Sequence, residues 1–251
     1  MSDWNGNISI SATKDAMARD ASEHAIKKLR DALDRKPQVR LLAATGASQF
    51  EFLDLVTASR QIDWPRVELF HLDEYIGMNE THPASFARYI RERIIEKTGI
   101  VKFHLLDGAR NPDEVIAGMN AMIAAAPIDV AFVGIGENAH LAFNDPPADF
   151  DTEVPYLRVR LDDACRKQQM GEGWFASFDD VPKEAISMSV RQILKSESIL
   201  CIVPDARKAA AVKAAVEGPI TPQVPASILR KHADVRLFLD RNSASLLSGE
   251  V

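Results

Sequence analysis

The feature that most constrains the fold is a regular alternation of short apolar runs with longer segments of helical periodicity. Runs rich in leucine and β-branched residues predict strands at 39–44, 67–72, 128–134, 198–203 and 235–239. Apolar residues recur at helical spacing over 13–35, 49–60, 84–97, 112–125 and 206–216. Strands separated by helices favour right-handed βαβ units. We therefore expect an α/β fold: a doubly wound, mostly parallel sheet with helices on both faces.

No repeat, low-complexity tract or linker divides the chain, so we expect a single domain over residues 1–251. The periodic pattern loosens around 145–180, where glycine, aspartate and aromatic residues replace the regular apolar positions. We expect an irregular, lid-like and mobile insert there.

The composition excludes several classes of protein. A hydrophobic content of 46% with 26% charged residues is typical of globular proteins. The longest apolar stretch, 123–136, is too short to span a bilayer, and residues 1–6 do not resemble a secretory signal. The two cysteines, Cys165 and Cys201, predict no disulfide framework, and the net charge of −6 argues against nucleic-acid binding. We expect a cytoplasmic protein with no membrane partner.

In doubly wound sheets, ligands bind beyond the carboxyl ends of the strands, so the loops there are the candidate sites. The first loop reads Thr45-Gly46-Ala47-Ser48. Its glycine allows close backbone approach, and the N-terminus of the next helix favours an anion. This pattern predicts a phosphate-monoester site. An equal alternative is that Ser48 only caps the helix.

A second candidate for anion binding is Lys208, which follows the strand 198–203. A lysine in the first turn of a helix opposes the helix dipole unless an anion lies there. Lys208 is therefore a candidate phosphate ligand, and the alternative is an exposed surface lysine.

Acidic residues directly follow the strand 67–72, namely Asp73 and Glu74. A carboxylate at a strand end can reach a ligand and act as a general base if its surroundings raise its pKa. The alternative for each is a solvated loop charge or a helix cap.

The loop after the strand 128–134 begins Gly134-Ile135-Gly136, like a dinucleotide-binding turn. Pro146-Pro147 arrive too soon for the long helix that such a site requires, so we reject nicotinamide cofactor binding. The loop instead presents His140, with Asp145 positioned to orient it as an acid/base group near neutral pH. The alternative is a structural histidine. The remaining histidines show no metal-ligand spacing, so we expect no metal and no cofactor: His24, His71, His82, His104 and His232.

Together these residues resemble the glucosamine-6-phosphate deaminase/isomerase family, which is related in fold to 6-phosphogluconolactonases. The resemblance covers about residues 35–240. Its most specific parts are Phe70-His71-Leu72-Asp73-Glu74-Tyr75, the segment from Gly134 to Pro146, and Lys208-Ala209 followed by Ala214–Gly218.

The resemblance implies an enzyme that converts glucosamine 6-phosphate and water to fructose 6-phosphate and ammonia. It implies that His140, held by Asp145, helps to open the sugar ring, that Asn138 belongs to the same catalytic set, and that Asp73 moves the proton from C2 to C1. Thr45, Gly46, Ala47 and Ser48 would bind the phosphate together with Lys208. Weaker substrate contacts are expected from Glu74, Gly136 and Arg166.

The chain departs from the family pattern at several of these positions. Asn138 stands where many members have aspartate, and Asp145 replaces the usual glutamate. Ala139 replaces the usual glycine before the histidine, and Arg166 is the nearest candidate for an arginine that contacts phosphate in the family's lid. The sequence does not indicate the sugar configuration, the oligomeric state or allosteric control.

Two other functions remain open at this point. A sugar-phosphate lactonase would use His140 to activate water, with no proton abstraction by Asp73. A non-catalytic sugar-phosphate sensor would retain the phosphate loops alone.

Overall fold

The computed structural model describes Trp4 and residues 7–248. The expectation about a secretory signal rests on residues 1–6, most of which lie outside the described residues. None of the helices described is long and apolar enough to cross a membrane.

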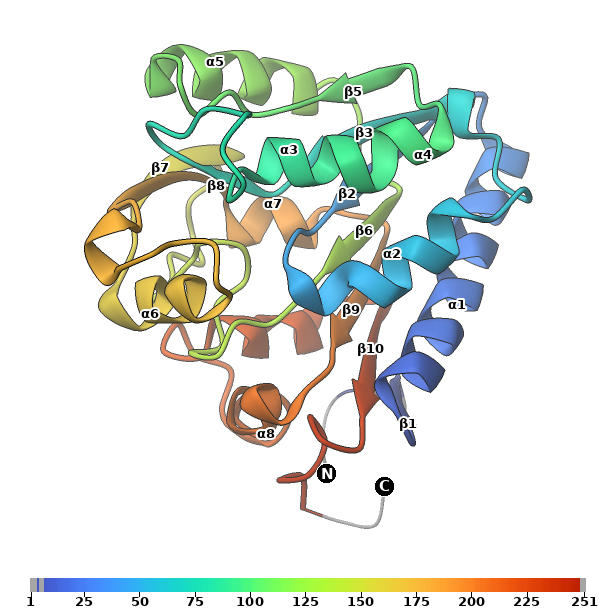
Figure 1. Ribbon diagram of the computed structural model, residues 1–251. Coiled ribbons are helices and arrows are strands. Elements are labelled where there is room, and N and C mark those ends of the chain that lie inside the picture. The colour runs from blue at the N-terminus through green and yellow to red at the C-terminus, as the bar shows by residue number, and fades with distance from the viewer. Residues whose placement is uncertain (1–3, 5–6, 249–251) are drawn as a thin grey trace.

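Seven strands form one sheet in the order β1-β10-β9-β6-β2-β3-β5, and every neighbouring pair is parallel. The prediction of a doubly wound, mostly parallel sheet is confirmed (Figure 1). The strands are β1 (Ile8–Ser11), β2 (Val39–Ala43), β3 (Val67–His71), β5 (Lys102–His104), β6 (Val130–Val133), β9 (Ser198–Val203) and β10 (Val235–Asp240).

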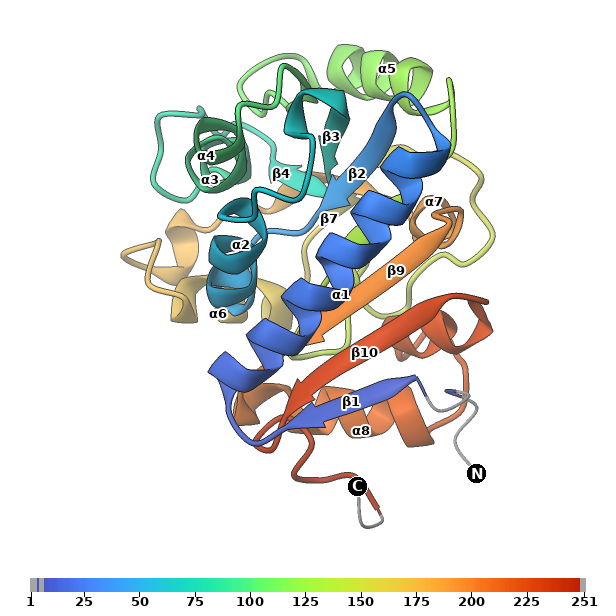
Figure 2. The ribbon, with the colours of Figure 1, turned by 90° about the vertical axis from the view of Figure 1, so that its right-hand side faces the viewer.

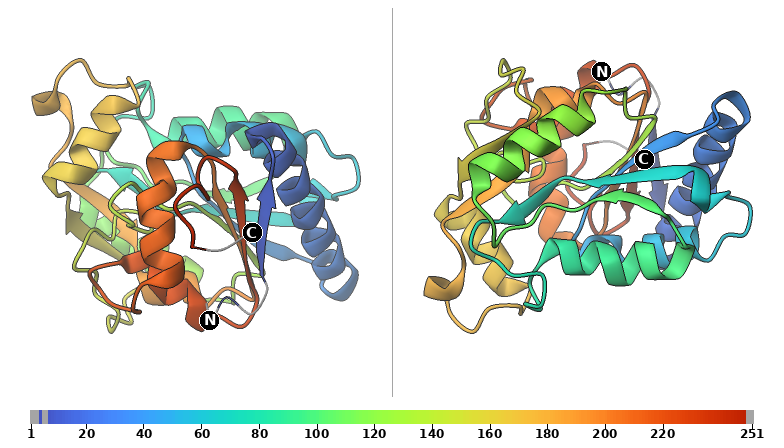
Figure 3. Two further views of the ribbon diagram at one scale, coloured as in Figure 1. Left: turned by 90° about the horizontal axis from the view of Figure 1, so that it is seen from below. Right: turned by 90° about the horizontal axis from the view of Figure 1, so that it is seen from above.

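Helices cover both faces of this sheet. In Figure 2, α1 crosses the near face and α8 lies behind the sheet, and Figure 3 shows α1 and α8 on opposite sides of β10. The helices are α1 (Lys14–Arg35), α2 (Phe50–Thr57), α3 (Phe86–Ile90), α4 (Glu96–Thr98), α5 (Pro112–Ile123), α6 (Asp163–Gly171), α7 (Val190–Leu194) and α8 (Ala209–Glu217). A π-helical turn, Arg91–Ile95, joins α3 to α4, and short 3₁₀ turns occupy Ala47–Gln49, Trp64–Arg66, Phe178–Asp180, Ala206–Lys208 and Pro225–Lys231.

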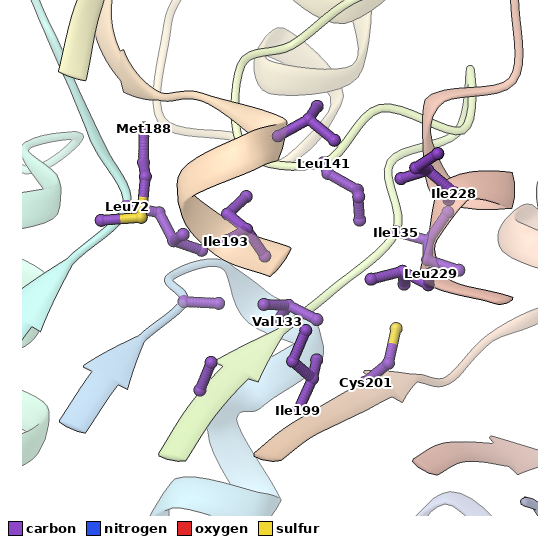
Figure 4. Close-up of a cluster of buried hydrophobic side chains, with 14 of the residues drawn as sticks. Leu72, Val133, Ile135, Leu141, Met188, Ile193, Ile199, Cys201, Ile228 and Leu229 are labelled. Carbon is purple, nitrogen blue, oxygen red and sulfur yellow. The ribbon is translucent and has the colours of Figure 1, made fainter. Parts of the chain in front are cut away.

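The central strands are largely apolar because they contribute to a core on each face. Arg40 on β2 and Glu68 on β3 are exceptions and form an ion pair at 3.3 Å. On β9, Ile199, Cys201 and Val203 pack into the core beneath α7 and α8, and Figure 4 shows Ile199 and Cys201 in this core. Leu200 and Ile202 pack into the core beneath α1. This two-sided burial explains why the strands appear in the sequence as continuous apolar runs.

The structure also contains a second sheet that the sequence pattern did not predict. It is antiparallel, in the order β4-β8-β7, with β4 at Asp73–Tyr75, β7 at Tyr156–Arg160 and β8 at Glu184–Met188. The segment 145–180, expected to be irregular, therefore contains β7 and helix α6, while 145–155 and 172–180 are loops and turns. The Tyr156 hydroxyl donates to the carbonyl of His71 at 2.6 Å, which ties β7 to the end of β3.

The order of the strands determines where a ligand can bind. From β2 the chain proceeds outward through β3 to β5 and then returns to place β6 on the other side of β2. The loops after β2 and β6 therefore diverge, and such a switch point is where doubly wound sheets open a crevice.

Candidate active site

A cleft opens at this switch point, beyond the carboxyl ends of β2, β3, β6 and β9. It brings together most of the candidate residues identified from the sequence. Those that line it are Thr45, Gly46, Ala47, Ser48, Asp73, Gly136, His140 and Lys208.

Two loops of similar conformation form one end of the cleft. After β2, Gly46 has a φ of 100° and leads into the 3₁₀ turn Ala47–Gln49; after β9, Asp205 has a φ of 79° and leads into Ala206–Lys208. Helix α2 follows the first turn and α8 follows the second, so both helix N-termini face this end. A positive φ suits glycine at position 46, and backbone N–H groups at helix starts favour an anion.

Lys208 adds a positive charge to this end of the cleft. Lys208 is only 8% exposed, and its ammonium group has no ion-pair partner among the residues that the structure describes. Burial lowers the pKa of Lys208. A buried lysine without a counter-ion, beside two helix starts, is well suited to bind a phosphate.

Asp73 lies deeper in the cleft, at the start of β4. Its carboxylate accepts no hydrogen bond within the described part of the chain, although the residue is only 6% exposed. Burial, with a smaller contribution from the neighbouring Glu74 charge, raises the pKa of Asp73 well above its ordinary value. These are the properties of a carboxylate that can take a proton near neutral pH.

His140 lines the same cleft as Asp73 and has polar groups beside its ring. Its Nδ1 lies 3.2 Å from Oδ1 of Asp145, without forming a linear N–H···O bond. Asn138 donates from Nδ2 to the same Asp145 oxygen at 3.0 Å and accepts from the backbone N–H of His140 at 3.2 Å. Burial opposes the charge on Asp145, but the His140 ring and these donors keep the pKa of Asp145 below its ordinary value. Asn138 therefore positions the Asp145 carboxylate and the backbone of His140, although Asn138 does not line the cleft itself.

The backbone around His140 is tightly folded. A Cβ on Gly136 would lie 2.2 Å from Nε2 of His140, so only glycine allows the ring to occupy its position. Ala139 has a φ of 67°, a left-handed conformation that favours glycine. This explains why glycine is the usual residue there in the family that the sequence resembles.

Two of the weaker candidate residues do not line the cleft. Glu74 turns away from the cleft and accepts hydrogen bonds from the Ser85 hydroxyl and the Ala87 N–H at the start of α3; burial raises the pKa of Glu74 to about 7. Arg166 is buried and donates to the carbonyls of Phe178 and Val181. It holds the turn that follows α6 and does not line the cleft.

Sequence reasoning missed the contribution of α6 to the cleft. Gln168, Gln169 and Glu172 line its outer side, and Gln169 accepts a hydrogen bond from the Tyr75 hydroxyl at 2.8 Å. Burial raises the pKa of Glu172. Glutamines on a short helix give no chemical signal in a sequence, although Asp162, whose side chain caps α6, is a recognisable helix start.

Sequence spacing also predicted no metal site, yet the structure brings three candidate ligand atoms together. Single donor atoms of His140, Asp145 and Cys165 all lie within 4.8 Å of one another. The residues are separated by five and twenty positions, which matches no metal-binding sequence motif.

Comparisons with known proteins identify relatives over most of the chain. The model of the family described as glucosamine-6-phosphate isomerases/6-phosphogluconolactonase matches residues 12–238. The chain is 35% identical over 233 residues to the glucosamine-6-phosphate deaminase of Lacticaseibacillus paracasei, covering 91% of this chain and 95% of that protein. It is 36% identical over 206 residues to the protein of the same name from Latilactobacillus sakei, covering 82% and 86%.

Solved structures show the same relationship. A monomeric glucosamine-6-phosphate deaminase matches with a TM-score of 0.87 at 26% identity, covering 96% of this chain and 99% of that one. A putative 6-phosphogluconolactonase from Neisseria gonorrhoeae matches with a TM-score of 0.75 at 20% identity, covering 93% and 98%. The second likeness is one of fold alone.

Proposed function

The chain belongs to the family of glucosamine-6-phosphate isomerases and 6-phosphogluconolactonases, and we propose that it is a glucosamine-6-phosphate deaminase. The reaction converts glucosamine 6-phosphate and water to fructose 6-phosphate and ammonia. The observation that carries the proposal is the carboxylate of Asp73, which accepts no hydrogen bond from the described residues and lines one cleft with His140 and Lys208. Proton transfer between carbon atoms requires such a base, whereas hydrolysis of a lactone does not.

Phosphate binding positions the substrate. The phosphate would be held at the end of the cleft formed by the turns after Gly46 and Asp205, which Ser48 and Lys208 also line. A phosphate held there places the sugar carbons toward Asp73 and His140. Binding energy from this remote group then contributes to orienting the reacting carbon.

His140 opens the sugar ring by transferring a proton between the C1 hydroxyl and the ring oxygen. Nε2 is the nitrogen available for this transfer, because Nδ1 faces Asp145. The carboxylate of Asp145 stabilises the imidazolium that forms during the transfer, and Asn138 holds that carboxylate in place.

Asp73 then takes the proton from C2 of the open-chain amino sugar, giving an enolamine, and returns it to C1. The product is an imine at C2. Water adds to that carbon, ammonia leaves, and fructose 6-phosphate remains. The raised pKa of Asp73 makes its carboxylate a stronger base than an ordinary aspartate, which favours removal of a proton from carbon.

We further propose that α6 and the turn after it act as a mobile lid, since Gln168, Gln169 and Glu172 close the outer side of the cleft. A cytoplasmic location is proposed because both cysteines are free thiols, which suits a reducing compartment.

The test is an endpoint assay with purified protein and glucosamine 6-phosphate. Ammonia and fructose 6-phosphate should appear in equal amounts, and glucosamine without the phosphate should react far more slowly. Glucose 6-phosphate, which lacks the amine, controls for phosphate-dependent side reactions. Hydrolysis of 6-phosphogluconolactone with no release of ammonia would instead assign the protein to the lactonase branch.

A further inference from the structure

Three groups with metal-binding donor atoms lie together where the His140 ring faces Asp145, and two of them, His140 and Asp145, also take part in the proposed reaction. Nδ1 of His140 and Oδ1 of Asp145 are 3.2 Å apart, and Sγ of Cys165 lies within 4.8 Å of both. Cys165 has no role in the chemistry proposed above. The three residues come from two segments, the loop after β6 and the first turn of α6.

The histidine donor in this cluster is buried, and the polar group beside it is the Asp145 carboxylate. The His140 side chain is only 9% exposed, and its Nδ1 makes no hydrogen bond of good geometry with any described residue. A buried ring nitrogen normally has a partner, because leaving it unpaired costs about 1–3 kcal/mol. This nitrogen is directed toward Asp145 and is available to a ligand.

The surroundings of the cluster are negatively charged. Asn138 donates from Nδ2 to carboxylate oxygens of both Asp145 and Asp162, at 3.0 and 3.3 Å, so the two acids lie side by side. No lysine or arginine in the described part of the chain forms an ion pair with either carboxylate. Two adjacent carboxylates without a cationic side chain favour binding of a divalent cation.

The start of α6 fixes the position of the thiol. The Asp162 side chain accepts from the backbone N–H of Cys165 at 2.6 Å, and the Asp162 N–H donates to Asp145 at 3.0 Å. These bonds join the first turn of the helix to the loop that carries His140. Cys165 is 1% exposed and is held against Asp145.

We propose that His140, Asp145 and Cys165 form a binding site for one zinc ion. Nitrogen, carboxylate oxygen and thiolate sulfur are the donors that zinc prefers, at about 2.0–2.3 Å each in a tetrahedral arrangement. The 3.2 Å between Nδ1 and Oδ1 is the separation that two such ligands of one ion would have. The thiol of Cys165 loses its proton to solvent when the metal binds, and water or a substrate hydroxyl takes the fourth position.

Zinc at this site would inhibit the enzyme, a consequence that rests on the proposed function. An imidazole whose Nδ1 is bound to the metal cannot easily become imidazolium, so His140 loses its capacity to transfer a proton. The ion would also hold α6, and with it the outer wall of the cleft, against the catalytic loop.

The test measures zinc binding directly and does not depend on turnover. Protein freed of metal is titrated with Zn²⁺ in competition with a chromophoric chelator, and in parallel with Co²⁺ to detect a thiolate-to-cobalt absorption band. The variants are Cys165→Ala and Asp145→Asn. Cys201→Ala is the matched control, because Cys201 is also a buried thiol but lies in the apolar core under α7 and α8 (Figure 4).

Wild type and Cys201→Ala should bind one zinc per chain and show the cobalt band. Cys165→Ala and Asp145→Asn should bind zinc more weakly, on the order of tenfold or more, and Cys165→Ala should lose the band. Equal zinc affinity in all four proteins, or no binding by wild type, would overturn the site. If the protein binds zinc through Cys165 but releases no ammonia from glucosamine 6-phosphate, the zinc-site proposal stands and the proposed function is wrong.

Discussion

Replacing Gly136 by alanine tests whether the position of the His140 ring sets the rate. The added Cβ would lie 2.2 Å from Nε2 and 2.3 Å from Cδ2 and Cε1 of His140. Non-bonded carbon contacts need about 3.5 Å, so the ring must move by more than about 1 Å. A displacement of that size costs on the order of 10²-fold in rate, equivalent to about 2.7 kcal/mol of activation free energy.

The effect should appear in kcat far more than in stability. Gly136 does not have a left-handed φ, so alanine adds no backbone strain, and the imidazole can turn within the open cleft. Gly118→Ala is the matched control: the site lies within α5, and the added methyl group meets nothing within 4 Å. It should leave kcat unchanged and raise the free energy of unfolding by up to about 1 kcal/mol.

The assay is steady-state ammonia release by both variants, with thermal unfolding to show that each is folded. A folded Gly136→Ala protein with wild-type kcat would refute the role assigned to the position of the ring. So would a loss of rate of the same size in Gly118→Ala.

Other substitutions test the remaining groups in the cleft. Asp73→Asn should lower kcat by about 10²–10⁴-fold. Because burial raises the pKa of Asp73, the ionised carboxylate destabilises the folded protein. The variant should therefore melt at a higher temperature than wild type at pH 7 but not at pH 3, where both folded and unfolded wild type carry the protonated group. The raised pKa of Asp73 should also place the acid limb of kcat/KM above pH 4, and a limb at the ordinary aspartate value of about 3.9 would contradict this assignment. Lys208→Met should raise KM by about 10–100-fold with little change in kcat, and an unchanged KM would remove Lys208 from the phosphate site. Arg166→Ala should lower the free energy of unfolding by about 1–3 kcal/mol, because it removes the donor to the carbonyls of Phe178 and Val181. A rise in KM with unchanged stability would instead indicate that Arg166 binds the phosphate.

The central sheet could be predicted from the sequence because its strands are buried on both faces. Each of β2, β3, β6, β9 and β10 is a largely apolar run, and β2 and β9 lead directly into a helical segment. Strands β1, β4 and β5 were missed because they are only three or four residues long and lie at an edge or in the second sheet. Runs this short carry too little periodicity to be recognised.

The second sheet could not be predicted from the sequence, for a different physical reason. The burial pattern of β7 alternates only in part, and β8 pairs with β4, which lies more than a hundred residues earlier in the sequence. Such long-range antiparallel pairing leaves no local signal. The same segment contributes α6 to the cleft, so the residues that close the site were missed together with the sheet.

The candidate site followed from the strand order, since residues after neighbouring parallel strands must meet at one edge of the sheet. Residue types alone could not give the direction of each side chain. Asp73 and Glu74 are adjacent on β4 and therefore point to opposite faces: Asp73 enters the cleft, and Glu74 binds the start of α3. The approach of Cys165 to within 4.8 Å of His140 depends on how α6 packs, which no spacing in the sequence shows.

The most direct test of the account is to run the reaction of glucosamine 6-phosphate in heavy water and examine the fructose 6-phosphate by mass spectrometry and NMR. The Asp73 carboxyl group opens onto the cleft and accepts no hydrogen bond from the described residues, so the proton that it carries can exchange with solvent. The account predicts deuterium at C1 of the product, formed together with an equal amount of ammonia. No release of ammonia, or deuterium at C1 with undiminished ammonia release by Asp73→Asn, would contradict proton transfer from C2 to C1 through Asp73. Ordinary hydrogen at C1 would instead mean that the carboxyl group returns the C2 proton before it exchanges with solvent.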